Sequence, residues 1–295
     1  MRLANEAAES AYRVLDKCTR ELEPVGPWRW RCVVQNGARL PMTASLEEGF
    51  LQLACHPDGI RREAVALGRA LLGNGTLPGG VKLALNAASR DLTLRTDIVL
   101  LDEIQLLERM RWAVQGFHEG HRLLKFPGSN AARAAKQISD ADGVHLGELL
   151  RESSWTFAER GPNEFSADLD AVSAPPARIA MIEGQILFSV ELARCAVAAE
   201  ATRQALAIFL LTASGALRLA RAHAMETDGD WSFGFQVCLP AAAATEEIDH
   251  ALAALSIAHR MCARESSVLL DEAAARCYLA ARDLPPTHDQ EEMEN

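Results

Sequence analysis

The spacing of apolar residues switches between a helical and a strand period along the chain. In the first half it predicts helix 7–22, strands 28–35, 39–43 and 50–55, helix 58–72, strands 81–85 and 92–98, and a helix from 102 onward. Apolar positions three and four residues apart indicate the helices, and alternation with period two indicates the strands. The dipeptide Asn36-Gly37 is typical of a hairpin turn between the first two strands.

The second half repeats this order of elements. It predicts helix 144–152, strand segments within 155–169, strands 178–182 and 186–192, helix 200–213, strands from 217 and at 231–239, and a helix from 245 onward. The strand limits between 155 and 169 stay open. The shared order predicts an α+β fold of two tandem α-βββ-α-ββ-α units, with antiparallel sheets packed against helices.

A polar segment of small residues separates the two units. Residues 127–143 carry no sustained apolar stripe, which is typical of a linker. We therefore predict a first domain at 1–126 and a second at 144–284. Residues 285–295 begin with two prolines and are mostly polar and acidic, so they are expected to be a disordered tail.

The last long helix of each unit carries a residue-level repeat. A shift of 138 residues pairs His121 with His259 and Arg122 with Arg260, and it aligns the apolar stripes of the two helices. This match and the repeated element order predict an internal duplication. A duplicated chain is expected to form a compact monomer whose units are related by an approximate two-fold axis.

The element order resembles the type III secretion chaperone fold. The resemblance covers nearly the whole chain, twice, and rests on helices such as 58–72 and 200–213 and strands such as 185–192 and 231–239. In that family two single-domain subunits pair, and an unfolded segment of a secreted effector wraps around apolar patches on their sheets and helices. The resemblance implies a pseudo-dimer within one chain and a partner that is another polypeptide, such as an unfolded effector segment.

Charge distinguishes the halves and narrows the class of partner. The net charge of −10 disfavours nucleic acid, whose binding depends on Lys and Arg neutralising phosphates. Residues 1–143 contain 19 Lys and Arg against 17 Asp and Glu, whereas residues 144–295 contain 11 against 23. The acidic second half is expected to attract a basic segment and to make more of the partner contact. The alternative is that its acidity only keeps an Ala-rich domain soluble.

The sequence indicates neither export nor a membrane span. The N-terminus becomes acidic at Glu6, and the most apolar segment, 196–213, is interrupted by Glu200 and Arg203. The seven cysteines form no CxxC pair and are expected to be reduced. We predict a cytoplasmic protein that does not bind membranes.

Catalytic motifs are absent from the sequence, and we predict a protein that is not an enzyme and binds no metal or cofactor. His118 and His121 share a helix face, but a zinc site needs a third protein ligand, so a partly buried packing role is favoured for His121. The serines form neither GxSxG nor SxxK, and no phosphate-binding loop is present. The leading hypothesis is a non-catalytic chaperone or adaptor. The alternatives are an enzyme with a histidine-centred site between the domains, and a scaffold or regulatory protein.

Apolar residues on two strands of the second unit are the candidate partner-binding residues. They are Ile186, Phe188, Val190, Trp231, Phe233 and Phe235. Such a strand face serves either as core or as a patch for a partner, and core is the default. The opposite face of the second strand, with Gly234, Gln236 and Cys238, is small and weakly polar, and it suits a docked segment.

One segment of the first unit alternates aromatic and basic residues. Trp28-Arg29-Trp30-Arg31 has the composition of a platform for single-stranded nucleic acid. Because the net charge opposes that function, we favour a strand whose Trp side faces the core and whose Arg side faces water.

Overall fold

The computed structural model describes residues 2–36, 38–56, 64–86, 91–125, 140–161, 163–169, 174–182 and 184–282. The first half contains α1 (Arg2–Cys18), β1 (Arg20–Gly26), β2 (Arg29–Asn36), β3 (Ala38–Glu47), β4 (Phe50–Cys55), α2 (Ala64–Asn74), β5 (Lys82–Leu85), β6 (Leu92–Val99) and α3 (Glu103–Lys125). The second half contains α4 (Asp140–Glu152), β7 (Phe157–Gly161), β8 (Glu164–Ala167), β9 (Ala177–Ile182), β10 (Gln185–Ala196), α5 (Glu200–Ala216), β11 (Arg221–Thr227), β12 (Asp230–Pro240), α6 (Thr245–Val268) and α7 (Glu272–Ala280).

Each half builds one six-stranded antiparallel sheet. The strand order is β1-β2-β3-β4-β6-β5 in the first sheet and β7-β8-β9-β10-β12-β11 in the second. When β1 is matched to β7 and each later strand to its counterpart, the two orders are the same. The predicted α+β fold of two similar units is therefore confirmed, with four strands rather than three before the middle helix. Common origin of the halves stays a prediction, because matching topology alone does not establish it.

The additional strands, β1 and β7, lie at the sheet edges. Most of their residues are exposed, so neither strand shows the alternation of apolar and polar residues that a half-buried strand shows. β1 also contains Pro24, which is tolerated at an edge because its missing N–H is not needed for a second neighbour. The spacing of apolar residues in the sequence therefore does not predict an edge strand of this kind.

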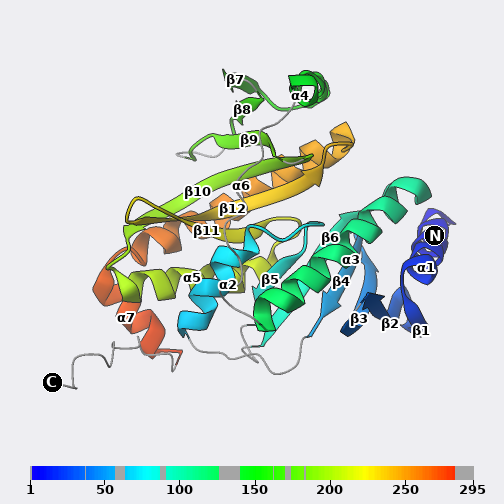
Figure 1. The fold of residues 1–295 in the computed structure, drawn as a ribbon, viewed down its shortest axis with the longest axis horizontal. Coiled ribbons are helices and arrows are strands. Elements are labelled where there is room, and N and C mark those ends of the chain that lie inside the picture. Colours follow the sequence, from blue (N-terminus) through cyan, green and yellow to red (C-terminus); the bar gives the residue numbers. More distant parts are fainter. Residues whose placement is uncertain are drawn as a thin grey trace.

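Long helices cover one face of each sheet and close the core. α3 packs on β6 and is flanked by α1, while α6 runs along β10 and β12 (Figure 1). Phe117 of α3 and Phe188, Phe233 and Phe235 of the second sheet are fully buried. Asp102 caps α3 from the position just before its first residue, since Asp102 Oδ1 accepts hydrogen bonds from the N–H groups of the first turn.

The two halves meet through equivalent elements. α2 packs against α5, α2 against β11, and α5 against β5 (Figure 1). Arg109 of α3 donates to both carboxylate oxygens of Glu247 of α6, at 2.9 and 2.8 Å. These two residues are separated by the same 138 positions that align the two helices. A contact between equivalent residues is what an approximate two-fold relation between the halves produces.

Several predicted limits differ from the structure. α4 begins at Asp140, so the last four residues of the predicted linker are helical. The helix predicted at 58–72 is described as Ala64–Asn74. The turn residue Gly37, the linker residues 127–139 and the tail 285–295 lie outside the described residues.

Candidate functional site

The six predicted partner-binding residues are all buried. Phe188, Phe233 and Phe235 are completely inaccessible, and Ile186, Val190 and Trp231 are nearly so. They form the face of β10 and β12 on which α6 packs. These side chains therefore act as core, and a partner cannot reach them while sheet and helix are packed together.

The opposite face of the second sheet is partly exposed. Its accessible residues on β9 and β10 include Arg178, Ala180, Ile182, Leu187 and Ser189, and these five are here called the open face. Strand pairing places Leu187 beside Ala180 on one side and beside Cys238 on the other. A pocket of about 310 Å³ opens next to them, with Phe165, Ala180 and Arg178 in its wall.

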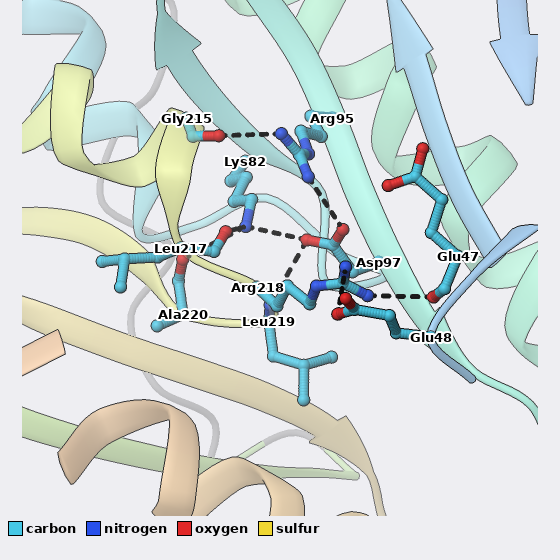
Figure 2. A network of polar contacts seen from close by, with 10 residues as sticks. All are labelled: Glu47, Glu48, Lys82, Arg95, Asp97, Gly215, Leu217, Arg218, Leu219 and Ala220. Carbon is cyan, nitrogen blue, oxygen red and sulfur yellow. Dashed lines mark hydrogen bonds and ion pairs between the residues drawn. The ribbon is translucent and has the colours of Figure 1, made fainter. Parts of the chain in front are cut away.

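A buried polar network joins the two halves where β5 and β6 meet the α5–β11 connection (Figure 2). Lys82 Nζ donates to Asp97 Oδ2 at 2.9 Å and to the carbonyl oxygens of Leu217 at 2.5 Å and Ala220 at 3.4 Å. Asp97 Oδ2 also accepts the N–H of Leu219, at 3.3 Å. The side chains of Lys82 and Asp97 are fully buried, so the charged form of each is stabilised by the opposite charge of the other.

Two arginines extend this network. Arg95 donates to the carbonyl oxygen of Gly215 at 2.7 Å and to Asp97 Oδ1 at 3.3 Å. Arg218 reaches in the opposite direction and donates to the carbonyl oxygen of Glu47 and to Glu48 Oε2, both at 2.9 Å (Figure 2). The contact surface is therefore held largely by cations that bind main-chain carbonyl groups of the other half.

The second half makes the same kind of contact in return. Arg221, the first residue of β11, donates to the carbonyl oxygens of Leu77, Val81 and Gly75. Its cross-strand neighbour Gln236 also donates to Gly75, at 2.6 Å.

Strand register defines which residues of the two networks are equivalent. Lys82 pairs with Arg95 in the first sheet, as Arg221 pairs with Gln236 in the second. Lys82 thus corresponds to Arg221, and Arg95 corresponds to Gln236. Asp97, two residues after Arg95, then corresponds to Cys238, two residues after Gln236. The first network contains a carboxylate at this position and the second contains a thiol.

This difference sets the electrostatics of the interface. Burial alone would raise the pKa of Asp97, but the charges of Lys82 and Arg95 outweigh burial and hold that pKa below its usual range. Burial lowers the pKa of Arg221, and this effect outweighs the opposing influence of Cys238. Burial likewise raises the pKa of the Cys238 thiol, whose Sγ donates to Gln185 Oε1 at 2.9 Å.

The histidines are desolvated to different degrees. His223 of β11 is buried at the contact with Gly75, and burial, followed by the charge of Arg221, lowers its pKa to about 4. Burial also lowers the pKa of His118 and of His259. His121 is partly buried on its helix, as expected for a packing role.

The described part of the chain contains neither a metal-binding cluster nor a membrane-spanning helix. There, no group of three or more His, Cys, Asp or Glu side chains is placed to hold a metal ion. That no metal binds His118 and His121 stays a prediction, which the metal content of protein purified without added metal would check. No helix within the described ranges is both long and apolar enough to cross a membrane.

The aromatic-basic segment divides between core and surface. Trp30 is buried and Arg31 is exposed, as predicted for a strand with one face toward the core and the other toward solvent. The prediction that Trp28 also faces inward is wrong: Trp28 lies in the β1–β2 turn, with φ of 55° and 45% of its surface exposed.

The interface cations were not among the candidate residues, although the sequence contains a signal for them. Lys82 lies between Val81 and Leu83, and Arg221 lies between Ala220 and Ala222. A cation at the start of an otherwise apolar strand indicates a buried partner, but it does not identify that partner.

Comparisons with known proteins give no family assignment. No protein-family model matches the chain. No curated protein matches it either.

Proposed function

We propose that this protein is a non-catalytic chaperone or adaptor whose fold is of the type III secretion chaperone kind. In this proposal the two halves act as a pseudo-dimer within one chain. The second half holds an extended, basic segment of another polypeptide against its open face. The protein works in the cytoplasm, a location supported by its buried free thiols, Cys238 and Cys262.

The partly exposed open face carries this proposal. Ala180, Ile182 and Leu187 offer apolar contacts there, while Arg178 and Ser189 offer polar ones. Apolar side chains of an extended segment fit a pleated face, because successive residues of the segment point alternately toward it and away from it. The surplus of acidic residues in the second half favours a segment rich in Lys and Arg.

Peptide binding by full-length variants tests this function. The probe is a labelled 20-residue peptide in which single Leu residues are irregularly spaced among Lys, Ser and Gly, so that it stays unstructured, and its affinity is measured by fluorescence anisotropy. Leu187→Ser removes a central apolar contact without adding charge, and it is expected to weaken binding about tenfold. Met225→Ser, at an exposed methionine on β11, is the matched control and should bind normally.

Two further results decide the proposal. Raising the salt concentration should weaken binding of the basic peptide, because screening reduces long-range attraction. A peptide with Glu in place of Lys should bind more weakly than the basic one. Equal affinities for Leu187→Ser and Met225→Ser, or no binding of any unstructured peptide, would show that the open face is not a client site.

A further inference from the structure

The two sides of the interface are equivalent in hydrogen bonding but not in charge. On one side Asp97 neutralises the buried Lys82. On the other side Arg221 is buried beside Cys238, which occupies the position equivalent to Asp97. Arg221 Nε also has no hydrogen-bond partner among the described residues. The charge of Arg221 is therefore held by carbonyl dipoles alone.

His223 lies next to this uncompensated charge. It is buried one side-chain pair along β11 from Arg221, and its Nδ1 has no hydrogen-bond partner among the described residues. A Cβ placed on Gly75 would lie 3.3 Å from the Cβ of His223, so the α2–β5 connection of the first half covers this histidine directly.

The charged groups around His223 do not neutralise the positive charge that protonation of this histidine adds beside Arg221. Arg221 is on its own strand, and Cys238 of β12 is held in its thiol form by burial. Glu191 of β10 is the neighbouring acid, but its carboxylate already accepts hydrogen bonds from Arg194 and Ser232.

The other elements packed on β11 contribute neutral groups or a paired cation. The described residues of α2 at this contact include the uncharged Asn74, whose Nδ2 donates to the carbonyl oxygen of Ala222. α5 contributes Ser214, whose hydroxyl accepts the N–H of Ala222. On β5, Lys82 is already paired with Asp97.

We propose that the contact between β11 and the α2–β5 connection is an acid-sensitive latch. Protonation of His223 opens this latch, while the contact built around Lys82 and Asp97 stays closed. The latch consists of Arg221, His223 and Gln236 on one side and residues 75–81 on the other.

The direction of the pH effect follows from burial. A solvated histidine takes up a proton near pH 6.5, whereas buried His223 does so only near pH 4, so between these values the open state binds the proton and is favoured. Because His223 is fully solvated in the open state, the ratio of open to closed molecules is roughly 30-fold higher at pH 5 than at pH 7.5. Opening releases Gln236 from Gly75, and it is expected to expose Cys238, two residues further along the same face of β12, where both residues continue the open face.

Thiol labelling of the full-length protein measures opening directly. The disulfide reagent 4,4′-dithiodipyridine is applied at pH 7.5 and pH 5, and each labelled cysteine is identified by peptide mass spectrometry. The cysteine thiolate attacks the reagent and releases 4-thiopyridone, and protonation of the pyridine ring keeps the reagent reactive at pH 5. The exposed Cys277 reports the intrinsic rate, and Cys262, on the buried side of α6, reports global unfolding. The labelling rate of Cys238, divided by that of Cys277, should rise roughly 30-fold from pH 7.5 to pH 5. At pH 5 Cys238 should also react faster than Cys262. Equal rates for Cys238 and Cys262 would mean global unfolding and would overturn the latch.

Two variants test the residues involved. His223→Gln should abolish the acid acceleration at Cys238, whereas His118→Gln, at a half-buried histidine of α3, should retain it. Cys238→Asp places a carboxylate where Asp97 stands in the first half, so its thermal midpoint should fall less than that of the wild type between pH 7.5 and pH 5. Acceleration that survives in His223→Gln, or an unchanged acid-induced fall in Cys238→Asp, would refute the proposal.

Discussion

Asp97 is the residue on which the interface network depends most. Its carboxylate accepts hydrogen bonds from Lys82, Arg95 and the N–H of Leu219, and no other acidic side chain contacts Lys82 among the described residues. A buried cation that loses its anion keeps the full desolvation cost without the compensating attraction.

Replacing Asp97 should therefore destabilise the protein strongly. Asp97→Asn is expected to lower the free energy of unfolding by about 3–5 kcal/mol, measured by urea denaturation. Glu272→Gln, which breaks the exposed pair with Arg276, is the matched control and should cost less than about 1 kcal/mol. Similar losses in both variants would contradict a buried ion pair at this position.

The same carboxylate gives a pH dependence. Because its pKa is lower in the folded protein than in the unfolded chain, its stabilising contribution is complete above the unfolded value of roughly 4 and is lost as the pH falls below it. Between pH 5 and pH 3, unfolding free energy should fall more steeply for the wild type than for Asp97→Asn. Parallel curves would show that Asp97 does not contribute.

Trp28 occupies a backbone conformation that its side chain disfavours. The two halves share the sequence Gly-Pro-X, in which X is Trp28 in the first half and Asn163 in the second, and X has a positive φ in both halves. Asn adopts this conformation readily, whereas a bulky side chain does not.

Exchanging these two residues should change stability in opposite directions. Trp28→Asn is expected to raise the free energy of unfolding by about 1 kcal/mol, and Asn163→Trp to lower it by a similar amount. Thermal unfolding of the two variants provides the measurement. A loss of stability in Trp28→Asn would show that packing of the exposed ring outweighs the backbone strain.

At the scale of elements, close helix packing in the first half depends on glycine. A Cβ on Gly116 of α3 would overlap the carbonyl oxygen of Pro78 and approach Val81, so the helix backbone lies directly on the α2–β5 connection. Gly68 of α2 has no atom within 4 Å of the same position. Neighbouring atoms therefore leave no room for a side chain at Gly116, whereas a side chain at Gly68 would meet none.

Alanine substitution at these glycines should separate packing from helix propensity. Gly116→Ala is expected to destabilise the protein by about 1–3 kcal/mol, because the added methyl forces α3 away from the connection. Gly68→Ala should stabilise it by about 0.5–1 kcal/mol, as expected for an uncrowded helix interior. Chemical denaturation of both variants gives the comparison, and equal effects would mean that α3 adjusts freely.

The predictability of an element depended on whether one of its faces is buried. β10 and β12 alternate apolar and polar residues because α6 covers one face, and both were predicted. β1 and β7 are exposed at most positions and have no such alternation. No strand was therefore predicted at 20–26, where the helix predicted at 7–22 extends into β1, and the strand limits between 155 and 169 stayed open.

At the scale of the molecule, the halves are held by contacts that are largely buried. Arg109 and Glu247 are almost inaccessible, and so are Lys82, Asp97 and Arg221. Buried contacts are screened little by salt. Association of the halves should therefore not depend on the covalent connection between them.

Coexpressed fragments test this expectation. Fragments 1–126 and 127–295, with a tag on the first only, are expected to copurify as a one-to-one complex and to remain associated at high salt. Arg109→Glu in the tagged fragment places two acids face to face and should abolish copurification, whereas Arg122→Glu, at an exposed residue of the same helix, should not. Separate elution of the unmodified fragments would show that the linker is needed.

The sequence by itself determined the α+β class, the two units and the core strands, because burial of one face imposes a period that local spacing reveals. It could not determine that Ile186, Phe188 and Phe233 are core rather than contact surface, since both roles require the same alternation. Only the tertiary structure showed that Lys82 and Arg221 bind carbonyl groups of the opposite half and that Cys238 stands where the first half has Asp97. These pairings join residues more than 130 positions apart, and no local pattern encodes contacts that form only when the two sheets come together.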